Sequence, residues 1–179
     1  MLTTTIGDEL KIATDFKAKV IGVSLKDRAA ILPAGHAADG AYWIDYSTGT
    51  FISSTYYMKE LPKWAVDYNK SIGKVTKDQI CYTPLGNKIT EEMAKAAVAG
   101  EQLGGDNVTD LLAVSFSCTD MIGHKYGTHS DKTREIYVDL DKRLADLFGY
   151  LDQNVGKDQY LVFLMADHGA ANSILLSRE

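Results

Sequence analysis

Two pairs of aspartate and histidine residues each come directly after an apolar, strand-like run of this sequence. Asp120 and His124 stand four residues apart after the run at 110–117, and Asp167 and His168 are adjacent after a second run. A carboxylate oxygen and an imidazole nitrogen are both ligands of divalent transition metals, zinc above all, at about 2 Å. One such pair alone is more often a helix cap or a surface pair, but its repetition after two strands predicts a metal site.

The two pairs would hold an ion in different ways. If a helix follows the first run, Asp120 and His124 share one face of it, because residues four apart are neighbours on a helix. Asp167 and His168 cannot share a helix face, but both reach one ion from a sharp turn. Gly169, the next residue, permits such a turn.

A third polar group follows the apolar run at 19–25. Lys26 and Arg28 stand two residues apart, and an extended chain sends both side chains to the same side. Arginine grips phosphate with two parallel hydrogen bonds and lysine acts as a point charge, so together they would form an anion pocket beside the metals. The alternative is a solvated Lys-Asp-Arg turn. The net charge of −5 argues against a nucleic acid partner, so an anion would need a local cationic site of this kind.

The elements that must position these residues follow an α/β pattern. The runs at 19–25, 110–117 and 160–166 are short and apolar, as is typical of buried strands. The segment 130–156 is predicted as a long amphipathic helix that stops at Gly156. Two apolar strands joined by a long helix favour parallel pairing through a crossover connection. Ligands bind at the carboxyl edge of such sheets, so both Asp-His pairs are expected along one edge.

The fold class that we predict is α/β, a mainly parallel sheet flanked by helices, with a small β-hairpin lobe. Aromatic and β-branched runs around Ser-Thr-Gly predict the hairpin over 41–57, which we expect as an inserted lobe near the active site. A helix is predicted over 89–105 with Thr90 as its N-cap. On the long helix, Asp139 is expected on the solvent face. Nothing marks a domain boundary, so residues 1–179 are interpreted as a single, partial domain.

Four stretches, considered together, resemble the alkaline phosphatase superfamily. They are “SLKDRAAILPAGH”, “AYWIDY”, “TDMIGHKYG” and “ADHGAA”, and the resemblance extends over nearly the whole chain. More narrowly, the chain resembles the phosphate-irrepressible alkaline phosphatases of Bacteroidetes-type bacteria, which group with type I phosphodiesterases and nucleotide pyrophosphatases. The resemblance implies a two-zinc enzyme that hydrolyses phosphate monoesters through a covalent phospho-enzyme, with a small-molecule phosphate ester as its partner. Paired metal ions stabilise the attacking and leaving oxygens of such a reaction.

The resemblance also implies a role for each residue singled out above. Asp120 and His124 would bind one zinc ion, together with a histidine from far downstream. Asp167 and His168 would bind the other, together with an aspartate from far upstream. The Lys-x-Arg pair after the first strand would contact the non-bridging phosphate oxygens.

Some parts that the resemblance implies are absent from the sequence. The Thr or Ser nucleophile and one ligand would precede residue 1, and another ligand would follow residue 179, so we expect an internal piece of a larger enzyme. Ser53, Ser54 and Thr55 are typical of a hairpin rather than of a nucleophile. His36 and His129 are candidate substitute ligands, with a surface or helix-entry role favoured for His129. Catalytic zinc takes three protein ligands and an open position, whereas each pair supplies two. We therefore expect weak metal binding and little or no activity from this chain alone.

The residues are also compatible with two other functions. One is a phosphodiesterase or nucleotide pyrophosphatase, whose substrate carries a second substituent on phosphorus, and the other is a non-catalytic metal-binding domain. No apolar stretch approaches the roughly 20 residues of a membrane span. The first residues lack a signal-peptide pattern, so a periplasmic or extracellular location is implied by the resemblance alone. Cys81 and Cys118 are interpreted as two buried thiols, and no feature of the sequence sets the oligomeric state.

Overall fold

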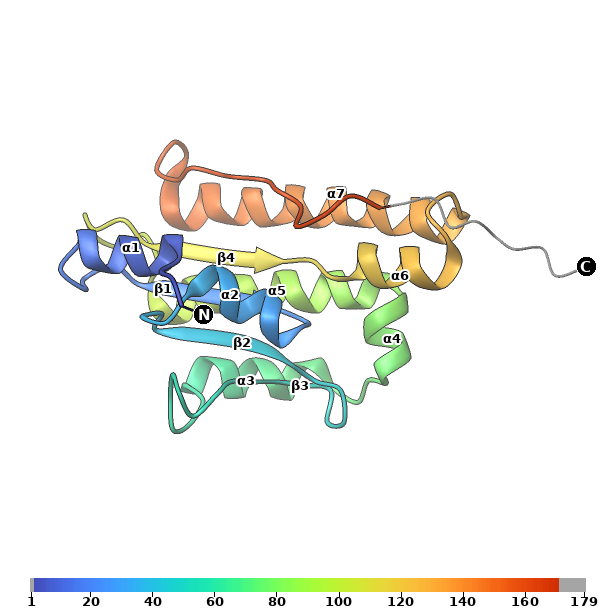
Figure 1. Ribbon diagram of the computed structural model, residues 1–179, viewed down its shortest axis with the longest axis horizontal. Coiled ribbons are helices and arrows are strands. Elements are labelled where there is room, and N and C mark those ends of the chain that lie inside the picture. Colours follow the sequence, from blue (N-terminus) through green and yellow to red (C-terminus); the bar gives the residue numbers. More distant parts are fainter. Residues whose placement is uncertain (1, 171–179) are drawn as a thin grey trace, which may run out of the picture.

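The computed structural model describes residues 2–170, and these form a four-stranded sheet covered by helices (Figure 1). The strands are β1 (Val20–Ser24), β2 (Gly40–Asp45), β3 (Thr50–Ile52) and β4 (Leu111–Ser115). Their order across the sheet is β3-β2-β1-β4. β1 pairs in parallel with β2 and with β4, whereas β2 and β3 are antiparallel. The prediction of an α/β fold with a mainly parallel sheet is confirmed.

Helices connect the strands and cover the sheet within the described part of the chain. They are α1 (Ile6–Ala13), α2 (Asp27–Ala34), α3 (Lys63–Ile72), α4 (Lys77–Tyr82), α5 (Pro84–Glu101), α6 (Cys118–Tyr126), α7 (Asp131–Leu151) and the π-helical turn η1 (Asp152–Gly156). Two of them, α2 and α6, begin within three residues of a strand end, because the hydrophobic period changes there from two to about 3.6 residues. α7 crosses the molecule lengthwise and packs on α5 and α6 (Figure 1).

The central strand β1 is buried at every position because a helix covers each of its faces. Gly22 faces α2, and a Cβ atom there would lie 2.2 Å from the carbonyl oxygen of Ala30. Glycine therefore permits the close approach of this helix. Ile21 and Val23 point to the opposite face, where they join a core cluster with Met93 of α5.

The predicted hairpin is present, but it is not a separate lobe. β2 and β3 pair with Asp45 opposite Thr50, and β2 also pairs with β1, so the hairpin forms one edge of the main sheet. Phe51 is fully buried, and its ring lies 6.0 Å from that of Tyr68 on α3. The lobe prediction is wrong because these aromatic residues extend the central core instead of making a core of their own.

Helix α5 begins earlier than the sequence pattern suggested. Thr83 is its N-cap, with its hydroxyl accepting a hydrogen bond from the backbone of Leu85, and Pro84 opens the helix. Thr90, the predicted cap, lies inside the helix and is buried, and its hydroxyl donates to the carbonyl of Gly86 at 2.8 Å. A threonine before two glutamates fits a cap by composition, but a proline six residues upstream is the stronger start signal.

Asp139 of α7 does not lie on the solvent face. Its side chain is 12% exposed, and it accepts hydrogen bonds from Asn87 at 3.1 Å and from Arg143 at 3.4 Å. Arg143 also pairs with Glu91, a residue of α5 that is 1% exposed. The solvent-face prediction is wrong because an apolar stripe marks one packed face and does not reveal charged groups that pair across a second helix.

The apolar run at 160–166 does not form a strand. Residues 161–165 are exposed, with Leu164 at 81% and Met165 at 86%. A buried strand needs a paired neighbour and cover on both faces, and the described residues give this run neither. Tyr160 anchors its start by donating to the Asp152 carboxylate at 2.7 Å. The strand prediction is wrong because an apolar run indicates a preference for burial and not the presence of partners.

Candidate active site

The site begins at the ends of two neighbouring parallel strands, β1 and β4. Lys26 comes two residues after β1, and α6, which carries Asp120 in its first turn, begins soon after β4. Ser24 and Ser115, the last residues of these strands, are opposite each other in the ladder. This alignment brings Lys26 Nζ to 2.6 Å from Asp120 Oδ2, although 94 positions separate them in sequence.

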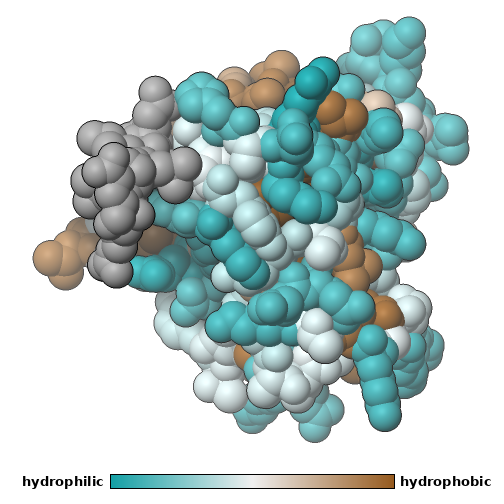
Figure 2. Space-filling model, turned by 90° about the vertical axis from the view of Figure 1, so that its right-hand side faces the viewer, coloured by the Kyte–Doolittle hydropathy of each residue, from teal (hydrophilic) through white to brown (hydrophobic). Residues whose placement is uncertain are grey.

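Asp120 is the centre of the cluster. The chain turns into a helix after β4, as the site prediction required, and His124 Nε2 lies 3.0 Å from Asp120 Oδ1. His168 arrives from the far end of the described chain and places its own Nε2 3.8 Å from the same oxygen. Two imidazoles and one ammonium therefore approach one carboxylate. Figure 2 views the molecule from the side where α6 lies in Figure 1. Hydrophilic and neutral residues dominate that view.

The charges in the cluster shift the acidities of its members. Partial burial alone raises the pKa of Asp120, but the hydrogen bond and charge of Lys26, helped by the two histidines, outweigh it and lower the pKa below its usual value. The pKa of His168 is raised by its hydrogen bond to the carbonyl of Gly169 and by the charge of Asp167. Asp120 is thus kept as an anion, which is the form that binds cations.

Two predicted site residues lie outside this cluster. Asp167 is 92% exposed, and its contact is with His168, at 3.9 Å. The condition set for Arg28, an extended chain after β1, does not hold, because α2 begins at Asp27. Arg28 is an exposed residue in the first turn of that helix, and its backbone nitrogen donates to the Asp27 side chain.

His129 lies in the connection between α6 and α7, whereas the other residues considered as substitutes lie at the opposite edge of the sheet. His36 precedes β2 and so belongs to the amino edge, where its Nδ1 is 3.1 Å from Asp8 Oδ2. Ser53 follows β3, which runs antiparallel, and donates to the carbonyl of Ala41 near the start of β2. Ser54 and Thr55 come next in that loop. The structure therefore places His36 and the hairpin residues away from the Asp120 cluster, which supports the structural interpretation of Ser53, Ser54 and Thr55.

Two residues of the site were missed by sequence reasoning, Ser24 and Ser117. Ser24 is fully buried, Ser117 is 5% exposed, and their hydroxyl oxygens lie 3.1 Å apart between Lys26 and α6. The signal that could have found them is their position, because each is a polar residue at the end of an apolar run. Cys118, next to Ser117, is buried, and burial raises the pKa of its thiol to about 12. Cys118 and Cys81 are both free and buried, as predicted.

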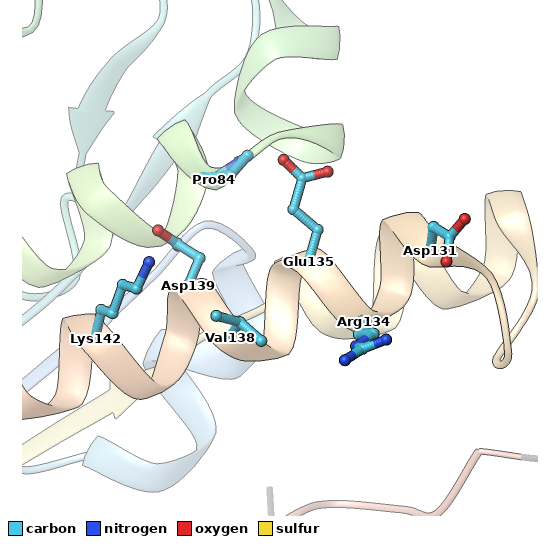
Figure 3. A pocket seen from close by; sticks show the side chains of 7 residues that line it. All are labelled: Pro84, Asp131, Arg134, Glu135, Val138, Asp139 and Lys142. Atoms are coloured by element: carbon cyan, nitrogen blue, oxygen red, sulfur yellow. The ribbon is translucent and has the colours of Figure 1, made fainter.

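A surface hollow of about 500 Å³ lies elsewhere, between α7 and the start of α5 (Figure 3). Its lining residues are Pro84, Asp131, Arg134, Glu135, Val138, Asp139 and Lys142. In Figure 3 Glu135 and Asp139 point toward Pro84, whereas Arg134 points away. None of these residues belongs to the Asp120 cluster. We therefore assign the chemistry to the edge of the sheet and not to this hollow.

The cluster contains side chains of the kinds that bind metals, but they are not arranged around a common point that could hold an ion. Within residues 2–170, no group of three or more His, Cys, Asp or Glu side chains is arranged to hold a metal ion. Asp120 Oδ2 is taken by the Lys26 ammonium, and His168 stands further from Oδ1 than His124 does. The prediction of two metal-binding pairs therefore stays a prediction.

The fold and site define a class of protein, an α/β domain with a cluster of one ammonium, one carboxylate and two imidazoles at the carboxyl edge of its sheet. The chain belongs to the type I phosphodiesterase / nucleotide pyrophosphatase family, whose sequence model matches residues 13–174. This membership confirms the resemblance seen in the sequence motifs.

Individual relatives point the same way. Alkaline phosphatase PafA of Elizabethkingia meningoseptica is 42% identical over 221 aligned residues, which include 96% of this chain and 40% of the relative. Alkaline phosphatase PhoV of Synechococcus elongatus is 41% identical and is covered to the same extent. The crystal structure of wild-type PafA superposes with a TM-score of 0.91 at 43% identity, over 96% of this chain and 42% of that one. The chain spans about 40% of the length of the curated relatives.

In the described part of the chain, no helix is long and apolar enough to cross a membrane.

Proposed function

We propose that this chain provides the anion-binding and metal-binding edge of a zinc-dependent phosphatase that hydrolyses phosphate monoesters. The observation that carries the proposal is the meeting of Lys26, Asp120 and His168, from three distant segments, at one edge of the sheet. A cation for the phosphoryl group and donors for a metal are what such a reaction needs in one place. The alkaline phosphatase names of PafA and PhoV support the same reaction class.

Asp120 and His124 would hold one zinc ion and His168 the other, and the approach of both imidazoles to Asp120 Oδ1 supports this assignment. His168 Nδ1 lies 3.0 Å from the carbonyl oxygen of Gly169. A hydrogen on Nδ1 therefore leaves the lone pair of Nε2, the atom nearer to Asp120, for a metal. Asp167 is proposed as a further ligand through the resemblance. When bound, a pair of zinc ions would supply Lewis-acid charge at the phosphoryl oxygens.

Lys26 would recognise the phosphoryl group. Its side chain is 41% exposed, so its ammonium is open to an incoming anion while it stays paired with Asp120. An ammonium held in place stabilises the charge of the equatorial oxygens without being reoriented during the reaction. Arg28, one helical position from Asp27 and exposed, remains a proposed second anion contact through the resemblance. The covalent phospho-enzyme is proposed on the same ground, with a nucleophile from outside residues 2–170.

A chimera tests the proposal in a complete enzyme. Residues 13–170 of this chain replace the matched region of PafA, and hydrolysis of 4-nitrophenyl phosphate is measured with and without a zinc chelator. We expect chelator-sensitive hydrolysis by the chimera and little or none by the 179-residue chain alone, because the chain has two donors per pair. A matched chimera with Asp120→Asn is expected to lose most of its zinc and activity. A folded, zinc-loaded chimera that hydrolyses no phosphate ester would support the non-catalytic, metal-binding alternative.

The description of the matching family favours a second candidate, hydrolysis of phosphodiesters or nucleotide pyrophosphates. A diester carries less negative charge at phosphorus, so it gains less from Lys26 than a monoester does. We therefore expect the chimera to prefer 4-nitrophenyl phosphate over bis(4-nitrophenyl) phosphate. A preference for the bis ester would make the second candidate the function of this site.

The cellular location is part of the same proposal. We propose a periplasmic or extracellular enzyme, and the expected observation is the chain, or the protein that contains it, in the periplasmic or culture fraction of its host.

A further inference from the structure

We propose that the hydroxyl–hydroxyl bond between Ser24 and Ser117 is a positioning device, which holds the anion-binding lysine against the metal-binding helix α6. The bond joins the last residue of β1 to the residue before α6. Its consequence for catalysis rests on the proposed function, but the geometric claim does not.

Ser24 uses its whole hydrogen-bonding capacity at this junction. Its Oγ lies 3.0 Å from the carbonyl oxygen of Ser115, 3.1 Å from Ser117 Oγ and 3.3 Å from the backbone nitrogen of Lys26. A hydroxyl has one hydrogen to donate and two lone pairs to accept with. The assignment that satisfies all three contacts has Ser24 donating to Ser115 and accepting from Lys26 and from the hydroxyl of Ser117.

Ser117 does not cap helix α6 with its side chain, although it occupies the N-cap position. A serine at a helix N-cap ordinarily accepts a hydrogen bond from a backbone N–H of the first turn. Ser117 occupies the N-cap of α6 and makes no such side-chain bond. Its hydroxyl instead crosses to β1, and Asp120 follows three residues later. One buried bond therefore links the chain just before Lys26 to the turn that carries Asp120.

The link matters because the Lys26–Asp120 ion pair is partly solvated. The two side chains are 41% and 27% exposed, and an exposed ion pair holds two flexible side chains together weakly. Fixing the two backbones beforehand lowers the conformational entropy that the pair, and later a bound phosphate, would otherwise lose. The Ser24–Ser117 bond is a buried contact that fixes them beyond the end of the β1–β4 ladder.

The test compares Ser117→Ala with Ser117→Thr in the 179-residue chain. Two rates are measured by NMR at constant pH: exchange of the Lys26 amide with water, and exchange of the Lys26 ammonium protons, which an ion pair slows. We expect Ser117→Ala to accelerate both at least threefold and Ser117→Thr, which keeps a hydroxyl, to restore them. The control is Ser130→Ala, which removes the N-cap of α7 and is expected to lower the melting temperature without changing either rate. Unchanged Lys26 exchange in Ser117→Ala would overturn the proposal.

The functional consequence is measured separately in the PafA chimera. Inhibition by inorganic phosphate should weaken at least threefold in Ser117→Ala, with zinc content retained and with recovery in Ser117→Thr. If the chimera without this substitution is inactive while the exchange rates respond as expected, the proposed function fails and the positioning inference stands. If the chimera is active and Ser117→Ala binds phosphate as tightly as before, the inference fails.

Discussion

Asp120 is the residue on which the candidate site depends, because a metal and Lys26 would both use its carboxylate. Its Oδ2 pairs with the Lys26 ammonium and its Oδ1 faces the two imidazoles. Without a metal, the Lys26 ammonium neutralises part of the negative charge of the Asp120 carboxylate, the charge that would attract a zinc ion. A metal that binds here must share Asp120 with Lys26 or displace it.

Replacing Lys26 with methionine should therefore raise zinc affinity. The pair is partly exposed and so is worth at most about 1 kcal/mol, which corresponds to an increase of up to about fivefold. Phosphate binding should fall in the same variant, because the anion loses its cation. Calorimetric titration with zinc and then with phosphate measures both, with Lys63→Met on the exposed part of α3 as the control. Weaker zinc binding by Lys26→Met would mean that the lysine supports the metal site instead of competing with it.

Asp8 provides a second prediction at this scale, at the other edge of the sheet. Burial alone raises its pKa, but hydrogen bonds from the backbone of Ala37 and from His36 and Thr5 outweigh burial and lower the pKa to about 2. An aspartate whose folded-state pKa is below its unfolded-state value stabilises the fold above about pH 4. That stabilisation is lost as the pH falls from about 4 toward 2, where the folded carboxylate also becomes protonated.

Asp8→Asn should lower the free energy of unfolding at pH 7 by about 1.5–3 kcal/mol, the range for hydrogen bonds to a charged group. Its stability should also change less than that of the unmodified chain between pH 4 and pH 2. Urea unfolding followed by circular dichroism at pH 7, 4 and 3 measures both effects, and Asp141→Asn on the exposed side of α7 is the control. An equal acid sensitivity in Asp8→Asn would show that other carboxylates cause it.

At the scale of elements, the interface between α5 and α7 depends on paired charges. Asp139, Arg143 and Glu91 form a chain of ion pairs between the helices, and Asn87 donates to one end of it. Removing one partner of such a network leaves the others buried without compensation.

Asp139→Ala should therefore destabilise the fold by about 1–3 kcal/mol, since Asn87 and Arg143 lose an acceptor in a buried setting. Asp146→Ala is the matched control, because Asp146 lies on the same helix and is 60% exposed, 3.7 Å from the same arginine. It should change stability by less than about 0.5 kcal/mol. Chemical denaturation of the two variants gives the comparison, and equal effects would show that the network contributes nothing beyond surface charge.

The elements also show what the sequence can and cannot predict. β1, the β2–β3 hairpin and the long helix α7 were predictable, because each has a clear hydrophobic period. The meeting of Asp120 with Lys26 was predictable from the rule that parallel strands align their carboxyl edges, whereas His168 reaches Asp120 from a segment that is not a strand. The burial of Asp139 and the exposure of residues 161–165 were not, because both depend on which other segment is near. The Ser24–Ser117 bond was missed for the same reason, since it joins residues 93 positions apart.

At the scale of the whole molecule, the length of the alignment with PafA shows how this chain differs from its relative. The alignment with PafA has 221 positions, more than the 179 residues of this chain, so PafA carries additional residues inside the matched span. A TM-score of 0.91 shows that the shared elements nevertheless superpose. The fold of this chain therefore matches that of PafA despite the additional residues.

The largest exposed apolar segment of the described chain leads to the last prediction. Residues 161–165 are five consecutive apolar side chains, with Phe163 at 74% exposure. Within the described residues, β4 is an edge strand that pairs with β1 on one side and has no strand on the other. Apolar segments without charge and free strand edges both favour self-association. We expect the 179-residue chain to associate with rising concentration in sedimentation experiments, and Phe163→Lys to reduce this at least severalfold by placing a charge in the segment. Tyr137→Lys, on the exposed side of α7, controls for a change in net charge, because Tyr137 is 55% exposed outside the segment. If both variants reduce association equally, net charge and not this segment is its cause.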